Sequence, residues 1–432
     1  MPDPLPPETD PAAVDPAAEP GAYAAFRHAM FRRYLTGAVL MALGTSAQTL
    51  AIQWEMYIRT DSAWSLGLVG LVQAIPMLTL TLPAGYLADV FDRRKLMLLS
   101  MLGTSATSLA LAWSSHAEAS NTVMYALLFL DSAFLRLGWP ARSALLPLLV
   151  PRHDFENAVK WRSSFGQVSQ VVGPAMGGFI LAWSLPATYL FSAASTLVFA
   201  ALLTTMQTRA QQRNARGHMF RQIGEGLQFV WSQKLLLGAI SLDLFAVLLG
   251  GAVYLLPIFV REIIDVSAVG LTPEQALGWL RSAPAAGALL MALVLAHLPP
   301  LRHAGRTMLA AFFAFGAATI VFGLSTAFWL SLVMLFLTGA FDMVSVVVRQ
   351  TLIQLVTPDD KRGRVSAVSA VFISSSNELG GFESGAVAAL LGPVFSVVSG
   401  GVGTLAVVLA WSGLFPALRK FGRLDSATEA GS

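Results

Sequence analysis

The chain has no cysteine among its 432 residues, which excludes disulfide bonds, thiolate metal sites and cysteine nucleophiles. Charged side chains are also scarce, because Asp, Glu, Lys and Arg make up 12 % of the sequence against about 25 % in an ordinary soluble domain. The sequence lacks a Gly-x4-Gly-Lys-Ser/Thr phosphate loop, which argues against ATP as an energy source. The six histidines are scattered and no Ser-His-Asp arrangement is visible, so we expect no metal site, no cofactor and no enzyme.

Apolar residues make up most of the chain. Hydrophobic residues account for 55 % of it, and the mean hydropathy is +0.64. They are divided into runs of about 20 residues, the length that a helix needs to cross ~30 Å of hydrocarbon. Backbone groups find no water in lipid and the runs show no period of two, so helices are expected rather than barrel strands. The composition therefore predicts an all-α polytopic membrane protein.

We expect twelve transmembrane helices. Six lie in the first half of the chain, at residues 34–57, 65–88, 96–115, 121–147, 158–182 and 186–206. Six lie in the second half, at residues 235–260, 276–297, 307–325, 329–356, 365–391 and 394–416. Connections such as 184–186 are so short that the helices on either side must run antiparallel.

The distribution of Lys and Arg predicts the orientation. With both termini in the cytoplasm, 22 of the 28 fall on segments inside the cell, and only Arg59 and Arg261 fall on segments outside it. The other four lie within or at the ends of spans: Arg136, Arg142, Arg281 and Arg349. This asymmetry follows the positive-inside rule and requires an even number of spans. It also explains the pI of 9.3 without a nucleic-acid partner.

Polar segments divide the chain into five parts. The N-terminal segment 1–33 is expected to be disordered and cytoplasmic, because its beginning is rich in Pro, Ala and acidic residues. A six-helix bundle at 34–206 and a second at 235–418 are separated by a cytoplasmic linker, 207–234, that contains an amphipathic stretch. A cytoplasmic tail, 419–432, follows the second bundle.

The two halves also resemble each other in sequence. Residues 142–151 align with residues 349–358 at an offset of 207, with Arg, two Leu and the final Pro identical. A similar offset brings the charged loop at 85–95 to the basic loop at 297–306. Internal repeats are typical of secondary transporters, whose substrate site lies where the repeats meet near the membrane midplane. Chance similarity between apolar segments is the alternative.

The loop between the second and third spans carries the most specific motif. Residues 85–95 read Gly-Tyr-Leu-Ala-Asp-Val-Phe-Asp-Arg-Arg-Lys, which resembles the pattern G-x-L-A-D-R-x-G-R-K of major facilitator superfamily transporters. The resemblance implies a cytoplasmic gate formed by Gly85, Asp89, Arg93, Arg94 and Arg349. The negative charge of Asp89 would be stabilised at a helix N-terminus, and Arg93 and Arg94 would favour the anionic inner leaflet. An ordinary positive-inside loop is the alternative.

A second motif lies in the fifth span. Its residues Gly173, Pro174, Gly177 and Gly178 resemble the G-P-x-x-G-G core of the superfamily's antiporter motif. Small residues let helices pack closely, and a proline bends the helix. In antiporters this region seals the exterior half, so the resemblance favours export. Ordinary packing of a glycine-containing helix is the alternative.

Local features narrow the resemblance to one branch of the superfamily. The segment 54–57, the pair Pro147 and Pro151, and Gly380 with Gly385 are similar to a branch that holds enterobactin-exporter-like carriers, macrolide-efflux carriers and lysophospholipid transporters. The resemblance covers about residues 30–420. It implies a bacterial inner-membrane protein, monomeric, with two pseudo-symmetric six-helix bundles.

Ionisable groups inside spans are costly and are candidates for proton coupling or substrate binding. The eleventh span is the richest, with Asn377, Glu378 and Glu383 among glycines. The two carboxylates are five residues apart, about 140° around a helix, so they face different neighbours. The other candidates are Asp243, Asp131, Arg136, Arg281 and Glu55. For each, a helix-packing ion pair or a position near the interface is the alternative.

These features together predict a transporter. The first hypothesis is proton-coupled export of a small amphipathic molecule, a siderophore or a drug-like compound, by alternating access. Its partners would be the small-molecule substrate, protons and membrane lipid. The second hypothesis keeps the fold and makes the protein a lysophospholipid flippase. The third is a membrane enzyme or a polytopic protein that binds partners without transporting anything.

Overall fold

The computed structural model describes residues 21–206, 219–299 and 301–422. Ten helices in these ranges are long and apolar enough to cross a membrane. Two more, α5 and α13, are as long as the others but carry several charged residues each. The described residues thus form twelve long helical segments, one for each predicted span, and they confirm the all-α membrane fold.

The first six long helices form one bundle. Their bounds are α1 Ala29–Thr60, α2 Ala63–Val90, α3 Arg93–His116, α4 Asn121–Leu145, α5 Phe155–Trp183 and α6 Leu185–Thr204. Three short turns accompany them, η1 Ala24–Arg27, η2 Leu146–Leu148 and η3 Arg152–Asp154.

The second bundle follows the helix α7, Met219–Ser232. Its long helices are α8 Lys234–Leu249, α10 Pro273–His297, α11 Ala304–Leu324, α12 Phe328–Val356, α13 Asp359–Leu391 and α14 Pro393–Leu414. The span that begins with α8 is interrupted and continues through η4 Gly251–Leu255, α9 Leu256–Ile258 and the π-helical turn η5 Phe259–Ile263. The short helices η6 Ser267–Val269 and α15 Pro416–Lys420 complete the bundle.

Local signals set several helix boundaries. Asp92 caps α3, because its side-chain oxygen accepts hydrogen bonds from the backbone N–H groups of Arg94 and Lys95, at 2.8 and 3.2 Å. Thr272 and Gln275 form a reciprocal capping box at the start of α10. These contacts satisfy backbone donors that the first turn of a helix leaves unpaired.

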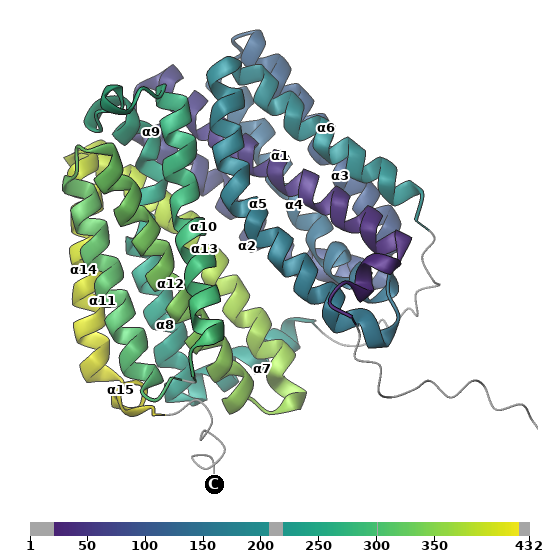
Figure 1. The fold of residues 1–432 in the computed structure, drawn as a ribbon, viewed down its shortest axis with the longest axis vertical. Coiled ribbons are helices and arrows are strands. Elements are labelled where there is room, and N and C mark those ends of the chain that lie inside the picture. Colours follow the sequence, from purple (N-terminus) through teal and green to yellow (C-terminus); the bar gives the residue numbers. More distant parts are fainter. Residues whose placement is uncertain (1–20, 207–218, 300, 423–432) are drawn as a thin grey trace, which may run out of the picture.

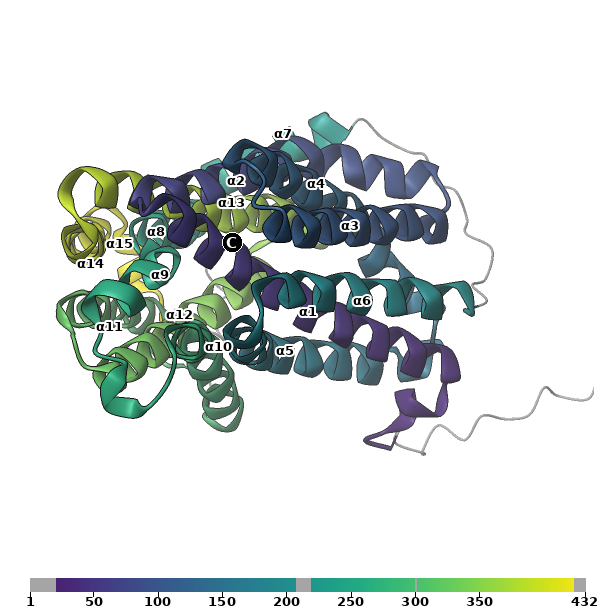
Figure 2. The ribbon, with the colours of Figure 1, turned by 90° about the horizontal axis from the view of Figure 1, so that it is seen from above.

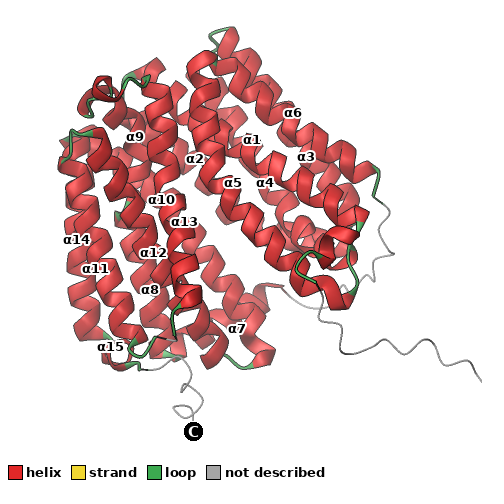
Figure 3. Ribbon diagram, in the orientation of Figure 1, coloured by secondary structure: helices red, strands yellow, loops and turns green. Residues whose placement is uncertain are grey.

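The two bundles lie side by side and lean together at one end. Figure 1 shows α1–α6 on the right and α8–α14 on the left, converging at the top and diverging toward the bottom, where α7 and α15 lie. The view from above in Figure 2 places the two bundles on opposite sides. Figure 3 shows that loops between the helices are short. We call the converging end the joined end and the other the splayed end.

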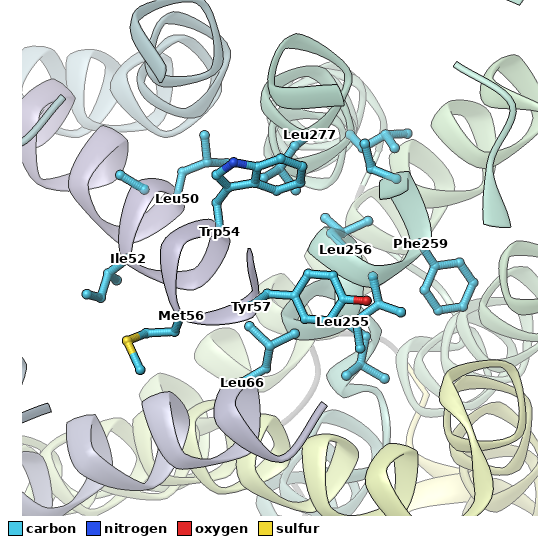
Figure 4. Packing of buried hydrophobic residues seen from close by; sticks show 14 of the residues in the cluster. Leu50, Ile52, Trp54, Met56, Tyr57, Leu66, Leu255, Leu256, Phe259 and Leu277 are labelled. Atoms are coloured by element: carbon cyan, nitrogen blue, oxygen red, sulfur yellow. The ribbon is translucent and has the colours of Figure 1, made fainter. Parts of the chain in front are cut away.

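Buried apolar residues show the same asymmetry. One cluster draws on both bundles at the joined end, where Tyr57 of α1 lies near Leu255 of η4 and Trp54 of α1 lies near Leu277 of α10 (Figure 4). Two further clusters each belong to a single bundle, one among residues 25–206 and one among residues 230–418. The bundles therefore share a core only at the joined end.

Glycines bring the two bundles into close contact there. A Cβ atom added to Gly178 of α5 would lie 2.8 Å from the Cα atom of Gly278 of α10. A Cβ atom added to Gly385 of α13 would lie 2.4 Å from the Cα atom of Gly67 of α2. Separations this short would be steric clashes, so the crossings α5–α10 and α2–α13 require residues without a side chain.

The start of the chain differs from the prediction. The turn η1 and the first turn of α1 fall inside the segment 1–33 that the composition predicts to be disordered, while residues 1–20 lie outside the described residues. Side chains of α5 hold this segment in place: the Asn157 amide and the Trp161 indole each donate to the Ala22 carbonyl at 2.9 Å. Tyr23 also stacks on Trp161. These partners are more than 130 residues away, so composition alone does not reveal them.

We predict that Gly178→Ala separates the bundles at the joined end. The added Cβ would lie 2.6 Å from the carbonyl oxygen of Glu274, and overpacking of this kind costs about 1–3 kcal/mol. Spin labels on Ala117→Cys and Ala268→Cys, in a chain that has no other cysteine, would report a longer distance between the bundles.

The matched control is Gly166→Ala on the same helix, where nothing lies within 4 Å of the added Cβ. This variant should leave the distance unchanged. Identical distance distributions for the two alanine variants would contradict the steric argument.

Candidate functional site

A polar cavity of about 600 Å³ lies between the bundles. Helices α1, α2, α4, α5 and α6 line it on one side, and η4, α10 and α13 line it on the other. Its charged lining residues are Arg136, Arg142, Arg162, Arg281 and Glu378. A second cavity, about 610 Å³, lies between α1 and α5 on one side and α10 and α12 on the other, and it shares Arg162 and Gln170 with the first. We call the two together the central cavity.

Glu378 of α13 connects the two bundles electrostatically. Its Oε2 accepts a hydrogen bond from the Tyr254 hydroxyl at 2.7 Å, and its Oε1 lies 3.7 Å from the guanidinium of Arg136 on α4. The sequence analysis singled out both Glu378 and Arg136, and the structure brings them together although 242 residues separate them. The side chains are 17 % and 32 % exposed, so this pair borders the cavity rather than the core.

Tyr254 reaches Glu378 because the seventh span is broken. The helix α8 ends at Leu249, and a Cβ added to Gly251 would lie 2.5 Å from the Gly380 carbonyl oxygen. The broken segment therefore packs directly on the backbone of α13. Glycine-interrupted spans mark binding sites in many transporters, so Gly250-Gly251 is a sequence signal that could have pointed to Tyr254.

Arg281 of α10 lies beside Tyr254. Its guanidinium donates to the Val253 carbonyl at 3.1 Å and sits 5.6 Å from the centre of the Tyr254 ring. Arg281 was a candidate from its position in a span, and it lines the central cavity.

Arg142 and Arg162 bring further positive charge to the central cavity. The Arg142 guanidinium contacts only neutral groups, the Leu135 carbonyl at 3.1 Å and the Met41 sulfur at 3.2 Å. Arg162 on α5 is exposed to the cavity. Neither residue was among the sequence candidates, although Arg142 stands in a repeated segment and Arg162 falls inside a predicted span.

Asp243 and Arg349 form a buried ion pair inside the second bundle. Each side chain is 2 % exposed, and the pair joins α8 to α12. Together with Asp342 and Asn377 they line a separate cavity of about 210 Å³. The sequence predicts Arg349 in a cytoplasmic gate, and the structure places it in a buried ion pair within the second bundle, where Asp243 provides the charge partner that lipid cannot.

Two candidate acids of the first bundle are held inside it. Asp131 of α4 is 4 % exposed and accepts a hydrogen bond from the Thr107 hydroxyl at 2.8 Å. Glu55 of α1 is 2 % exposed and accepts hydrogen bonds from Arg59 at 2.8 Å and from the Tyr189 hydroxyl at 2.6 Å. Neither residue lines the central cavity.

Asn377 and Glu383 diverge from Glu378 along α13. The Asn377 amide donates to the Ile373 carbonyl at 2.9 Å and faces the small cavity of the second bundle. Glu383 is partly buried, accepts a hydrogen bond from the Ser384 hydroxyl at 3.3 Å, and does not line the central cavity. The helical angle between the two glutamates thus separates their surroundings, as their spacing predicts.

The residues of the 85–95 loop lie at the splayed end. Gly85 lines a cavity between α2, α4 and α13, and a guanidinium nitrogen of Arg94 donates to the Thr204 carbonyl at 2.5 Å. Arg93 approaches the Ala88 carbonyl at 3.4 Å. The side chain of Asp89 lies outside the described part of the structure.

The glycines of the fifth span divide between two neighbours. Cβ atoms added to Gly173 and Gly177 would come within 2.7 and 2.8 Å of Ser46 and Ala47 on α1. Gly178 instead meets Gly278 of the other bundle, and Pro174 presents its carbonyl oxygen to the same glycine. The motif therefore packs one face of α5 within its own bundle and the other across the joined end.

A polar latch at the joined end was missed by the sequence analysis. The Tyr57 hydroxyl of α1 donates to the Glu262 carboxylate of η5. Arg261 lies 3.2 Å from Asp61 and 5.6 Å from the centre of the Tyr57 ring. Arg261 had been noted only as one of two basic residues expected outside the cell, and no local pattern pairs it with Tyr57 across the bundles. We call these four residues the latch.

Comparisons with known proteins identify the family. A family model described as "Transmembrane secretion effector" matches residues 20–430. Curated relatives include the enterobactin exporter EntS of Citrobacter koseri, which is 27 % identical over 402 residues covering 92 % of this chain and 94 % of that protein. EntS of Escherichia coli O157:H7 is 26 % identical over 401 residues, with the same coverage.

Solved transporter structures share the fold. The nucleoside transporter NupG superimposes with a TM-score of 0.74 at 11 % identity, covering 89 % of this chain and 100 % of that one. A D-xylose-proton symporter gives a TM-score of 0.65 at 14 % identity, covering 91 % and 98 %. Because the family model spans nearly the whole chain, this protein belongs to the transmembrane secretion effector family of major facilitator superfamily transporters.

Proposed function

We propose that the protein exports a small amphipathic organic molecule, of the siderophore or drug-like class, by proton-coupled alternating access across the bacterial inner membrane. The observation that carries this proposal is the central cavity, which lies between two bundles that share a buried apolar core at the joined end. The basic residues near the splayed end support its location in the cytoplasm. The cavity then faces the cytoplasm, from which an exporter takes its substrate. The similarity to enterobactin exporters supports this direction.

The joined end provides the barrier that such a cycle must open. The latch and the crossing of Gly178 with Gly278 hold it shut in this state. Rocking of the bundles would break these contacts and bring α2 and α13 together at the splayed end, beside Gly85. A latch of a few hydrogen bonds and ion pairs suits a reversible barrier, because each is worth only about 0.5–3 kcal/mol.

The contact between Glu378 and Arg136 suggests how protons take part. The contact joins the two bundles, so rocking changes it. In the proposed cycle Glu378 releases its proton to the cytoplasm in this state, in which the Arg136 guanidinium lies 3.7 Å away. When the contact opens, a carboxylate in apolar surroundings takes up a proton from the other side. This order of events moves protons inward while the substrate moves outward.

A lateral cavity supports a second candidate function, lysophospholipid transport. It measures about 660 Å³, lies between α2, α4 and α13, and is lined largely by apolar side chains that include Met77, Trp139 and Val371. Arg136 lines both this cavity and the central one. An acyl chain could occupy the apolar part while a headgroup meets the arginine.

Purified protein in liposomes with an imposed pH gradient separates the two functions. Gradient-dependent movement of drug-like or siderophore compounds, with no movement of labelled lysophospholipid, would support the exporter. Lysophospholipid movement that ignores the gradient would support the flippase. No flux of any compound would overturn both.

We predict that Glu378→Gln abolishes acceleration of transport by the pH gradient while the protein remains folded. Glutamine keeps the shape of the side chain and can still bond to Tyr254, but it cannot release a proton. Initial rates with and without the gradient, in proteoliposomes of equal protein content, measure the effect. The matched control is Glu383→Gln on the same helix, which should retain coupling because Glu383 does not line the central cavity. Full coupling in Glu378→Gln would overturn this assignment.

We predict that Tyr57→Phe opens the joined end in a larger share of molecules. The substitution removes the hydroxyl that donates to Glu262, and a hydrogen bond to a charged group is worth about 1.5–3 kcal/mol. The ratio of open to joined conformers should therefore rise by about tenfold or more. The spin-label pair at positions 117 and 268 measures this ratio. Tyr86→Phe at the splayed end, where the ring is exposed, is the control, and an equal shift in both variants would argue against the latch.

A further inference from the structure

We infer that the central cavity binds an amphipathic anion, which is held by Arg142, Arg162 and Arg281. If the bound anion is the transported substrate, the inference rests on the proposed function. The binding site itself is inferred from the charges that line the cavity. Four arginines and one glutamate are its charged lining residues, so the lining carries a net charge of +3 when Glu378 is ionised.

Glu378 cannot neutralise this charge. Its two oxygens are already engaged by Tyr254 and Arg136. In the part of the chain that the structure describes, no acidic side chain forms an ion pair with Arg142, Arg162 or Arg281. Arg142 also lies close enough to Arg136 and Arg162 for mutual repulsion. Arg142 and Arg162 thus border one polar space without an acidic partner among the described residues, and Arg281 shares the charge of Glu378 with Arg136.

The internal repeat allows Arg142, which has no acidic partner among the described residues, to be compared with its equivalent in the second half. Arg142 aligns with Arg349 of the second half, and Arg349 is neutralised by Asp243. At the same offset of 207, Asp243 aligns with Thr36, so the first half has an uncharged residue at the position of the acid that neutralises Arg349. One half therefore satisfies its arginine within the protein, and the other half leaves it facing the central cavity.

Arg142 and Arg281, which are partly buried, are costly unless something neutralises them. A cation that is removed from bulk water without a partner loses several kcal/mol of hydration. A carboxylate, sulfonate or phosphate recovers that loss, because the planar guanidinium donates two parallel hydrogen bonds to such groups. Among the described residues, the Arg281 guanidinium donates a hydrogen bond only to the Val253 carbonyl and lies over the Tyr254 ring, so most of its donors remain for a ligand.

The rest of the lining selects an anion with an apolar body. Trp139 and Tyr254 bring aromatic side chains to the cavity, on which a flat ring can stack. The lateral cavity continues from Arg136 with apolar lining, so the anionic group could also be a lipid headgroup. A free aromatic acid and an anionic lysolipid share this chemistry.

Binding to the full chain in phosphatidylcholine nanodiscs tests the inference with probes of matched shape. Naphthalene-2-carboxylate should bind at least about tenfold more tightly than naphthalene-2-carboxamide, and (naphthalen-2-yl)methylammonium should show no saturable binding. Added salt should weaken binding of the carboxylate and leave binding of the carboxamide unchanged. Equal affinity for carboxylate and carboxamide, or tighter binding of the ammonium, would overturn the inference.

Single substitutions locate the site. Arg142→Gln and Arg281→Gln should each reduce affinity for the carboxylate about tenfold and leave affinity for the carboxamide within about twofold. Arg281→Lys, which keeps the charge, should retain part of the preference for the carboxylate. The control is Arg419→Gln, an exposed arginine on α15 outside the cavity, which should not change binding. If an Arg→Gln variant does not fold, the salt titration of the native chain still decides the outcome, and unchanged carboxylate affinity in both folded variants would refute the site.

A competition experiment identifies the source of the anion. Displacement of the carboxylate by lysophosphatidylglycerol, but not by lysophosphatidylcholine, would assign the site to an anionic lipid headgroup. Failure of both lipids to compete would assign it to a free organic acid. Because binding is measured without a gradient, a chain that binds the carboxylate but transports nothing would contradict the proposed function and not the anion site.

Discussion

The close approach of bare backbones at the joined end is the constraint on which the structure depends. Gly178 lies against Gly278, and Gly67 lies against Gly385, so two helix pairs cross without side chains between them. In lipid there is little hydrophobic gain from joining helices, and close van der Waals packing is what holds them together. Because the bundles meet so tightly at one end, the space between them at the other end remains open and can be polar.

Charge is distributed unequally around that space. In the second bundle, Asp243 and Arg349 neutralise each other in the interior. In the first bundle, Asp131 and Glu55 are held by hydroxyl donors, and Glu55 also by Arg59. Among the described residues, the arginines between the bundles form one ion pair with an acidic side chain, that of Arg136 with Glu378. Charged side chains inside each bundle thus have partners that stabilise the fold, and arginines between the bundles can bind a ligand.

The sequence predicts the membrane architecture well because its signals are local. Run length and hydropathy locate all twelve helices, and the small residues of the fifth span identify a tight crossing. The pairing of charges is not local: Arg136 contacts Glu378 across 242 residues, and Arg349 pairs with Asp243 on another helix. Such partners follow from how the helices are arranged. The sequence does not predict the ordered structure just before α1 or the latch at Tyr57, because both depend on side chains from distant segments.

The unbalanced arginines also have an electrical consequence. Moving one elementary charge across a membrane potential changes the free energy by about 2.3 kcal/mol per 100 mV. If an anion fills the central cavity in the proposed export cycle, the loaded carrier would be closer to neutral, and the voltage would affect its outward step little. After release, the empty carrier would return with its positive lining exposed, and the negative interior of the cell would draw that charge inward. A voltage across the membrane would therefore drive the return of the empty carrier and make the cycle electrogenic.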